Sequence, residues 1–256
     1  MNSLMIAYSG GVDSTYLLYE AFKQLKEKVI AVTFLSELIP ESEIVDSKFF
    51  TKEMGIEHVV IPVDILSNKD FVNNTKDRCY ICKKIMIARL IELAKLRKIE
   101  KIAHGANTDD LKDYRPGMKA ATEMGVFSPL IEAGLNKNDI RLLSEKESLI
   151  TFDKPAMACL ASRIPMGEKI SKKKLGIIER SEYFLKSIGF RKYRVRYYNE
   201  TAKIETDPLE FNKMFDDKIR SEIIEAFKSY GFKTVSIDLE GYKMGGMNYS
   251  NISNEI

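Results

Sequence analysis

Ser9-Gly10-Gly11-Val12-Asp13-Ser14 is the stretch of this chain that decides its fold. It follows an apolar run at residues 4–8 and precedes a segment, 15–22, whose apolar residues keep helical spacing. A strand, a glycine turn and a helix start in this order aim backbone N–H groups and the positive end of a helix dipole at an anion. The glycines let a ligand approach the backbone, and the hydroxyls of Ser9 and Ser14 add donors. The stretch therefore predicts a phosphate site.

This form of the loop is also informative about chemistry. Walker-type loops are longer and end in Lys-Ser or Lys-Thr, and this loop has no lysine. The shorter form resembles the PP-loop of ATP pyrophosphatases, which cleave ATP to AMP and pyrophosphate and adenylate a substrate. The residues expected to bind the phosphates of ATP are Ser9, Gly10, Gly11 and Ser14. Asp13 is expected either as a ligand on the magnesium side or as the N-cap of the helix. An ordinary turn with two glycines is the alternative.

Composition places few restrictions on the class of protein. With 256 residues the chain suits one large or two modest domains and a sizeable core. It shows no signal peptide and no apolar run near the roughly 20 residues that span a bilayer, so we expect a soluble, cytoplasmic protein. Three cysteines are an odd number, and two of them are Cys79 and Cys82, which argues against a secreted disulfide framework.

Positive charge is concentrated in one part of the chain. Residues 163–203 hold 12 Lys and Arg against 4 Glu and no Asp, a local balance of +8, whereas the whole chain carries +3. The rest of the chain therefore sums to −5. Such a segment either attracts a phosphorylated partner or forms a solvated surface.

We expect residues 1–165 to form an α/β domain with a doubly wound parallel sheet. Apolar runs typical of buried strands occur at 4–8, 29–34, 58–63 and 101–105. Helical patterns occur at 43–54, closed by Gly55, at 79–98, and at 136–146 with Asn136 as a cap. Strands alternating with helices favour a parallel sheet that binds its ligand at the carboxyl ends of the strands.

The pattern changes after residue 150. A loop bounded by prolines covers 153–165. Beyond it, helical patterns at 172–188 and 217–230 accompany strand patterns at 193–198, 202–206 and 234–239. We therefore expect a smaller α/β domain at 166–256, which binds substrate or contributes to oligomerisation.

The three cysteines are candidates for a metal centre. Cys79 and Cys82 share one face at the start of a predicted helix, and Cys159 lies in the proline-bounded loop. Three thiolates are too few for a four-cysteine zinc site but suit a [4Fe–4S] cluster with one open iron. The alternatives are a redox pair, a persulfide or sacrificial cysteine, zinc, and plain core cysteines, because a free cysteine packs like a small apolar residue.

Five segments together resemble the LarE family. They are the PP-loop, residues 78–83 (RCYICK), 104–110 (HGANTDD), 113–117 (DYRPG) and 154–163 (KPAMACLASR), and the Arg-Val-Arg strand at 194–196 extends the match. LarE proteins are ATP-dependent sulfur transferases in the biosynthesis of the nickel-pincer nucleotide cofactor of lactate racemase. They adenylate a carboxylate of pyridinium-3,5-biscarboxylic acid mononucleotide and convert it to a thiocarboxylate. The resemblance implies a PP-loop fold, ATP and Mg²⁺ as cofactors, and a homo-oligomer.

The chain departs from the best-known form of that family in its cysteines. That form has one essential cysteine, matching Cys159, which gives up its own sulfur and becomes dehydroalanine. The additional Cys79 and Cys82 make this chain similar to the cluster-dependent variants, in which an open iron carries an exogenous hydrosulfide. The resemblance therefore implies that all three cysteines are catalytic and hold a [4Fe–4S] cluster. Sacrificial use of the Cys159 sulfur is the alternative.

Further nucleotide ligands are expected where strands end. Thr33 and Phe34 end the second predicted strand and are expected beside the adenine. Asn107 and Asp109 follow the fourth strand and are expected to reach nucleotide or metal.

Three arginines are expected to bind the substrate. Arg194 and Arg196 alternate on a strand, so both face one side and suit a phosphate or carboxylate; a solvated strand edge is the alternative. Arg163 is a further candidate anion ligand. We also considered two glutamates as cation ligands and assigned no role to the two histidines; these residues are Glu182, Glu205, His58 and His104.

Two other functions fit parts of this pattern. A cluster-dependent tRNA thiolase of the PP-loop superfamily also uses three cysteines, and the basic segment suits RNA phosphates. The second domain is a small platform for RNA, however, so we do not expect nucleic acid as a partner, nor a membrane. The resemblance to the LarE family implies a pyridinium mononucleotide and a sulfide donor as partners. A nucleotide-sensing or cluster-carrying protein without catalysis would release no pyrophosphate, and an amidating synthetase would need no sulfide.

Overall fold

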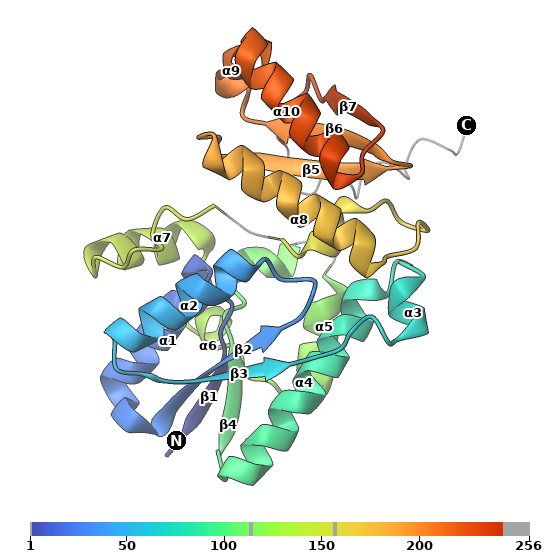
Figure 1. Ribbon diagram of the computed structural model, residues 1–256. Coiled ribbons are helices and arrows are strands. Elements are labelled where there is room, and N and C mark those ends of the chain that lie inside the picture. Colours follow the sequence, from blue (N-terminus) through green and yellow to red (C-terminus); the bar gives the residue numbers. More distant parts are fainter. Residues whose placement is uncertain (1, 113–114, 156–157, 243–256) are drawn as a thin grey trace. The chain divides into compact units, whose positions relative to one another are not determined.

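The computed structural model describes residues 2–112, 115–155 and 158–242 (Figure 1). Its contacts divide these residues into two units. The first unit consists of residues 2–71 and 75–155, and the second of 72–74 and 158–242. The boundary expected after residue 165 falls inside the second unit, because the turn that ends at Arg163 is bonded to that unit by the Arg163 side chain.

The sheet of the first unit is parallel throughout. Its strands are β1 (Leu4–Ala7), β2 (Val29–Leu35), β3 (Glu57–Pro62) and β4 (Lys101–His104), in the order β3-β2-β1-β4. The two central strands, β1 and β2, are buried along almost their whole length, as expected for apolar strands covered on both faces. The predicted doubly wound parallel sheet is confirmed.

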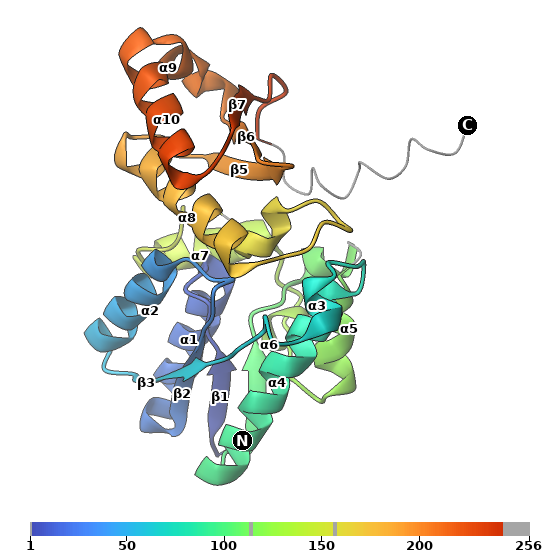
Figure 2. The ribbon, with the colours of Figure 1, turned by 45° about the vertical axis from the view of Figure 1, so that its right-hand side comes forward.

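Helices cover both faces of this sheet. α1 (Val12–Leu25) and α2 (Glu41–Glu53) lie on one face, and α4 (Arg78–Arg97) lies on the other, beside β4 (Figures 1 and 2). Because crossover connections are right-handed, the chain changes face when it returns from the edge strand β3 to β4. The strand order thus reverses between β1 and β4, and the carboxyl ends of these two strands are where such folds bind ligands.

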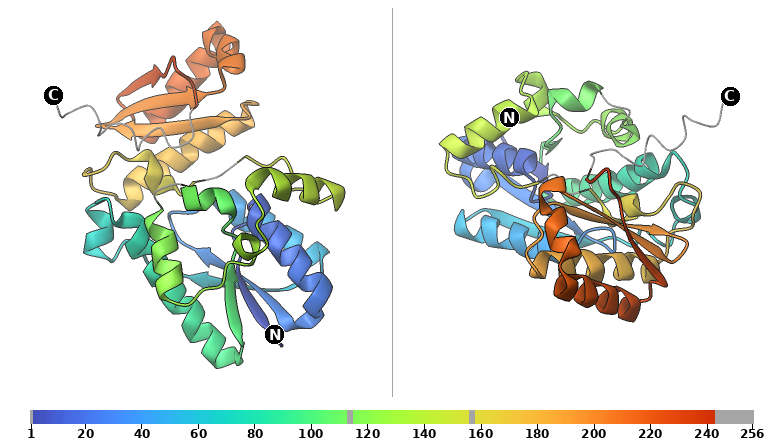
Figure 3. Two further views of the ribbon diagram at one scale, coloured as in Figure 1. Left: turned by 180° about the vertical axis from the view of Figure 1, so that it is seen from behind. Right: turned by 90° about the horizontal axis from the view of Figure 1, so that it is seen from above.

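Four more helices complete the first unit. They are α3 (Lys69–Val72), which ends at the division between the units, α5 (Pro116–Glu123), α6 (Pro129–Glu132) and α7 (Lys137–Lys146). α5 packs against α4, and α7 packs against α1 (Figure 3, left). The predicted cap Asn136 is confirmed: its side chain accepts from the backbone of Asn138 and Asp139, and the Asp139 carboxylate accepts from the Asn136 N–H.

The second unit is a small α/β structure, as its sequence predicts. β5 (Tyr193–Tyr198) pairs antiparallel with β6 (Thr201–Thr206), and β6 pairs parallel with β7 (Thr234–Ile237). α8 (Lys172–Ser187) and α10 (Asp217–Tyr230) lie side by side on one face of this sheet, and the short α9 (Phe211–Phe215) precedes α10 (Figure 3, right). No helix in the described part of the chain is long and apolar enough to cross a membrane.

A short early segment of the chain belongs to the second unit. Asn74 is completely buried, and its side-chain amide donates to the carbonyl oxygens of Ile164, Pro165 and Glu168 at 3.3, 2.6 and 3.0 Å. The Asn74 carbonyl accepts in turn from Gly167 N–H at 3.0 Å. The second unit is therefore discontinuous in sequence.

Candidate functional site

The predicted phosphate loop connects β1 to α1. Gly11 is the N-cap residue of α1, and no side chain caps that end of the helix. The first N–H groups of the helix are thus left for an acceptor from outside it, and the helix dipole favours an anion there. Gly10 has φ +72°, in the left-handed region that favours glycine. This geometry suits a phosphate.

The two serines of the loop differ in their role. Ser14 is buried; its hydroxyl donates to Gly11 O at 3.1 Å and accepts from Ser9 N–H at 3.3 Å. Because this uses the only hydroxyl proton of Ser14, the exposed Ser9 hydroxyl, 3.1 Å away, is the donor of that pair. A bound phosphate can compete for the Ser9 proton, whereas Ser14 holds the loop in shape.

Asp13 is the second residue of α1. The expectation that it is the N-cap is wrong, because the helix begins at Val12 and Gly11 occupies the cap position. Asp13 Oδ2 lies 2.5 Å from Lys137 Nζ. Asp13 Oδ1 is buried and has no hydrogen-bond partner among the described residues. A carboxylate oxygen with free lone pairs beside a phosphate loop fits a hard cation such as Mg²⁺.

Lys137 is a functional candidate that the sequence reasoning missed. It is the first residue of α7; its ammonium group contacts Asp13, and its backbone N–H donates to Asp109 Oδ2 at 3.0 Å. The backbone hydrogen bond from Lys137, followed by the contact with Lys112, lowers the pKa of Asp109. The only signal in the sequence was a lysine directly after a helix cap, which does not show that α7 begins beside the phosphate loop.

The end of β4 touches the phosphate loop. A Cβ on Gly105 would lie 2.7 Å from Ser14 N and 2.9 Å from Ser14 Cα, so this approach requires glycine. The residues that follow are therefore near the loop, as predicted. Asn107 is 3% exposed, however, and its Oδ1 accepts from Asp109 N–H at 3.0 Å, so its side chain shapes the turn. Contact of Asp109 with nucleotide or metal stays a prediction.

Thr33 and Phe34 are both buried at the end of β2. The Thr33 hydroxyl donates to Tyr8 O at 2.8 Å and therefore accepts from His58 Nε2, also at 2.8 Å. His58 Nδ1 lies 3.0 Å from Thr51 Oγ1, and burial lowers the pKa of His58, which favours the neutral ring. The side chains of this group are satisfied by one another, so the predicted contact of β2 with adenine would come from its backbone.

None of the three cysteines, all of them among the described residues, forms a disulfide. Cys79 and Cys82 lie in the first turn of α4, where Cys79 is exposed and Cys82 half-buried. The buried stripe of α4 begins only at Ile87, so the alternative of plain core cysteines does not fit Cys79. Two accessible thiols on one helical turn fit an iron–sulfur cluster as a pair of soft ligands, and Cys159 in the second unit is the third candidate. Within either described unit, no three His, Cys, Asp or Glu side chains are gathered as a metal site.

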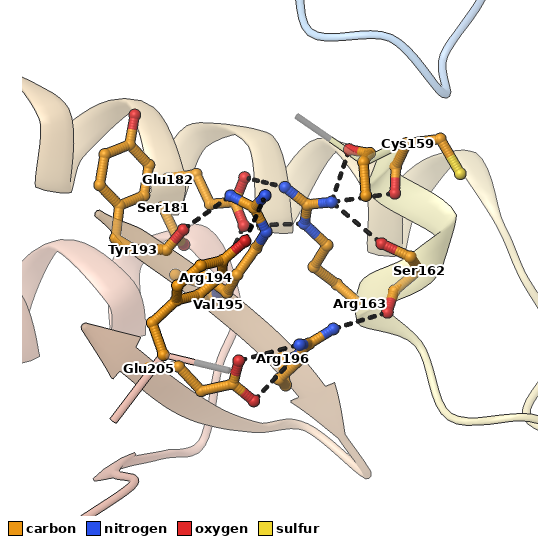
Figure 4. A network of polar contacts seen from close by, with 12 residues as sticks. Cys159, Ser162, Arg163, Ser181, Glu182, Tyr193, Arg194, Val195, Arg196 and Glu205 are labelled. Atoms are coloured by element: carbon orange, nitrogen blue, oxygen red, sulfur yellow. Dashed lines mark hydrogen bonds and ion pairs between the residues drawn. The ribbon is translucent and has the colours of Figure 1, made fainter. Parts of the chain in front are cut away.

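Cys159 precedes a 3₁₀ turn, Leu160–Arg163, that Arg163 holds in place (Figure 4). The Arg163 side chain is completely buried, and its Nε and Nη2 donate to the two carboxylate oxygens of Glu182, both at 2.9 Å. Its Nη1 donates to Ala158 O at 2.6 Å and Cys159 O at 3.0 Å. The guanidinium of Arg163 is thus occupied by the protein itself, and it positions the Cys159 turn instead of reaching a ligand.

Arg196 forms a second clamp on the same turn (Figure 4). Its Nε and Nη2 donate to the Glu205 carboxylate at 2.8 and 2.9 Å, and its Nη1 donates to Ser162 O at 2.9 Å. Glu182, which binds Arg163, also accepts from Val195 N–H at 3.1 Å. The cations that these two glutamates hold in this structure are arginine side chains.

Arg194 lies on the same strand, two residues before Arg196. Its Nη1 donates to Tyr193 O at 2.9 Å and its Nη2 to the Tyr242 hydroxyl at 3.2 Å, and the guanidinium lies 5.0 Å from the centre of the Tyr242 ring. Arg194 and Arg196 are only 6% and 5% exposed, so the solvated strand edge is wrong. Burial, then the like charge of Arg163, lowers the pKa of Arg194.

Comparison with known proteins identifies the family. The chain is 33% identical to the pyridinium-3,5-bisthiocarboxylic acid mononucleotide synthase of Lactiplantibacillus plantarum, over 97% of this chain and 90% of that protein. The chain belongs to the LarE family. Two uncharacterised proteins match over similar lengths, one from Synechocystis with 36% identity (97% of this chain, 92% of that protein) and one from Methanocaldococcus jannaschii with 33% (94% and 90%). No family model matches the chain.

LarE membership covers both units. Of the segments that carry the resemblance, residues 113–114 and 156–157 lie outside the described residues. The other segments supply the phosphate loop, the first turn of α4, the end of β4 and the Cys159 turn of this LarE protein.

Proposed function

We propose that this LarE protein is an ATP-dependent sulfur insertase. Its substrate is pyridinium-3,5-biscarboxylic acid mononucleotide, a carboxylate of which it adenylates and converts to a thiocarboxylate. The observation that carries the proposal is the uncapped start of α1 with Asp13 and Lys137 beside it, in a chain that matches a named synthase over 97% of its length. We further propose ATP cleavage to AMP and pyrophosphate, and a homo-oligomer.

The phosphate loop serves the first half of this reaction. A carboxylate is a poor electrophile, so its oxygen first attacks the α-phosphate of ATP and expels pyrophosphate, which leaves an acyl-adenylate. The first N–H groups of α1 and the Lys137 ammonium would spread the charge of the pyrophosphate, because donors fixed in advance need no reorganisation. Asp13 Oδ1 would hold Mg²⁺, which neutralises the same charge.

The cysteines serve the second half. Cys79, Cys82 and Cys159 would hold a [4Fe–4S] cluster, which would supply hydrosulfide for this half of the reaction. Attack of hydrosulfide on the acyl-adenylate forms the C–S bond and releases AMP. Arg163 and Arg196 fix the Cys159 turn. The basic segment 163–203 would attract the phosphorylated substrate. Holding the reacting groups together would lower the activation free energy by several kcal/mol, out of the roughly 7–11 kcal/mol that proximity can supply.

The test uses the full chain, purified and reconstituted without oxygen. Iron and acid-labile sulfide per chain are measured together with conversion of the pyridinium mononucleotide, which should need ATP and sulfide. About four irons per chain or assembled site and several products per chain are expected for a [4Fe–4S] enzyme. Cys79→Ser should lose iron and turnover together. No iron, at most one product per chain and a mass loss matching dehydroalanine at Cys159 would support the sacrificial route instead.

A further inference from the structure

A carboxylate of α2 faces the phosphate loop. A Cβ built on Gly10 would lie 3.6 Å from Glu43 O and 3.8 Å from Glu43 Oε2. Glu43 is only 8% exposed, so solvent screens its charge poorly. Asp46 follows on the same helix. Without compensation, these negative charges would repel any phosphate held at the loop.

The compensating charge comes from Lys154. Its Nζ lies 2.9 Å from Glu43 Oε2 and 3.0 Å from Asp46 Oδ2, and its side chain is 17% exposed. Burial opposes the charged form of this lysine, but Glu43 and Asp46 outweigh it and raise the pKa of Lys154. The ammonium group is therefore charged at neutral pH.

The backbone of Lys154 is fixed independently of these ion pairs. Arg141, on α7, donates from Nη2 to Lys154 O at 2.8 Å and from Nη1 to Phe152 O at 2.6 Å. A cavity of about 140 Å³ has both Gly10 and Lys154 in its wall, together with the buried Thr151. The lysine thus stands directly behind the phosphate loop, on the side where α2 meets it.

We infer that Lys154 is a positioning residue for nucleotide binding: it neutralises Glu43 behind the phosphate loop and so permits the loop to accept the phosphates of ATP. The inference rests on the proposed use of ATP. Lys154 itself does not contact the nucleotide. Its effect is electrostatic, so removing the charge of Glu43 as well should restore the binding that loss of Lys154 weakens.

The first test is the dissociation constant of MgATP, measured by calorimetry on the full chain. Lys154→Met should weaken binding about ten-fold, because an uncompensated buried carboxylate then faces the phosphates. Lys154→Arg should bind close to the wild type. Lys52→Met is the matched control, because it removes an exposed positive charge from α2, the helix that carries Glu43. It should leave the dissociation constant of MgATP unchanged.

The second test separates charge from direct contact. The double variant Glu43→Gln/Lys154→Met removes both charges of the pair, so it should bind MgATP more tightly than Lys154→Met and close to the wild type. Binding by the double variant as weak as that of Lys154→Met would overturn the inference, since it would show a role of Lys154 that does not pass through Glu43. Equal binding by wild type and a folded Lys154→Met would overturn it as well. A wild type that binds no MgATP would instead refute the proposed use of ATP, and the inference with it.

Discussion

At the scale of single residues, two buried ion pairs organise the second unit, Arg163–Glu182 and Arg196–Glu205. Arg163 and Arg196 each direct two parallel N–H groups at one carboxylate and a third at the carbonyls of the Cys159 turn. Paired donors of this kind fix orientation as well as distance. A buried charge pair adds little net stability, but it is costly to break on one side.

Removing the arginine of one pair should show the cost of leaving its buried carboxylate alone. Arg163→Met leaves Glu182 buried and uncompensated, so we expect a loss of about 3–5 kcal/mol in the free energy of unfolding. Urea denaturation of the two proteins measures it. The double variant Arg163→Met/Glu182→Leu removes both charges and should lose clearly less. Equal losses in the two variants would mean that packing, not the unpaired carboxylate, sets the penalty.

Asp13 should affect the rate of ATP cleavage through Oδ1, the oxygen that is proposed to bind Mg²⁺. Asp13→Asn keeps the shape of the side chain but removes the charge that would bind Mg²⁺ and that binds Lys137. We expect pyrophosphate release to fall by at least about 100-fold, because a direct ligand should exceed the 10–100-fold effect of outer partners. The dependence of the rate on Mg²⁺ concentration measures it. An unchanged Mg²⁺ dependence would exclude Asp13 as a ligand.

Sequence spacing predicted the faces of the elements better than the contacts of their side chains. The alternation of Arg194 and Arg196 placed them on one face of a strand, which holds. It gave no indication that the two arginines Arg163 and Arg196 would form ion pairs with glutamates of the same unit. Those contacts depend on how α8 and β6 pack against β5. Lys137 was missed for the same reason: its contact with Asp13 joins residues 124 positions apart.

At the scale of elements, the approach of β4 to α1 sets the geometry of the phosphate loop. Parallel strands of this fold end at one edge, and Gly105 lets the end of β4 meet the first turn of α1. Long elements with regular periodicity were all predicted, with ends shifted by a few residues. The short helices α3, α5, α6 and α9 were not, because four to eight residues are too few to show a helical pattern.

A methyl group at Gly105 should therefore disturb nucleotide binding. Gly105→Ala would place Cβ 2.7 Å from Ser14 N, so either β4 or the phosphate loop must move. We expect weaker MgATP binding and lower stability, measured by calorimetry and urea denaturation. Gly176→Ala is the control, since nothing lies within 4 Å of its Cβ in helix α8, and it should stabilise the protein by about 0.5–1 kcal/mol. Unchanged MgATP binding by Gly105→Ala would show that the loop does not depend on this approach.

At the scale of the whole molecule, stability should depend on pH through a buried histidine. Burial and then the charge of Lys83 lower the pKa of His104 from 6.5 to about 4. Between these values the unfolded chain holds a proton that the folded protein does not, so stability falls as the pH falls from 6.5 towards 4, by about 3 kcal/mol in all. Above pH 6.5 this group has no effect.

Urea denaturation across this pH range tests the prediction. His104→Gln keeps a partner for the Ser128 hydroxyl, 2.8 Å from His104 Nε2, and removes the titrating group. The variant should lose less stability than the wild type on acidification, with a remainder from His58, whose pKa burial also lowers. Identical pH profiles would show that His104 contributes nothing.

The distribution of charge over the molecule also bears on its partners. The basic segment 163–203 suggested either a solvated surface or a phosphorylated partner, and its composition could not distinguish them. Arg163, Arg194 and Arg196 are buried, so three of its 12 basic residues are not available to a long surface ligand such as RNA. The solvated-surface alternative therefore does not hold for these three arginines.

The discontinuity of the second unit limits how the protein can be dissected. A fragment that starts at Ala158 would lack Asn74, and three backbone carbonyls would lose the amide that now satisfies them. Each buried acceptor left alone costs about 1–3 kcal/mol, so such a fragment should be unstable. During synthesis on the ribosome, Asn74 likewise leaves the exit tunnel well before its acceptors exist. A fragment made to study the second unit alone should therefore retain residues 72–74. They can be joined to residues 158–242 by a designed linker.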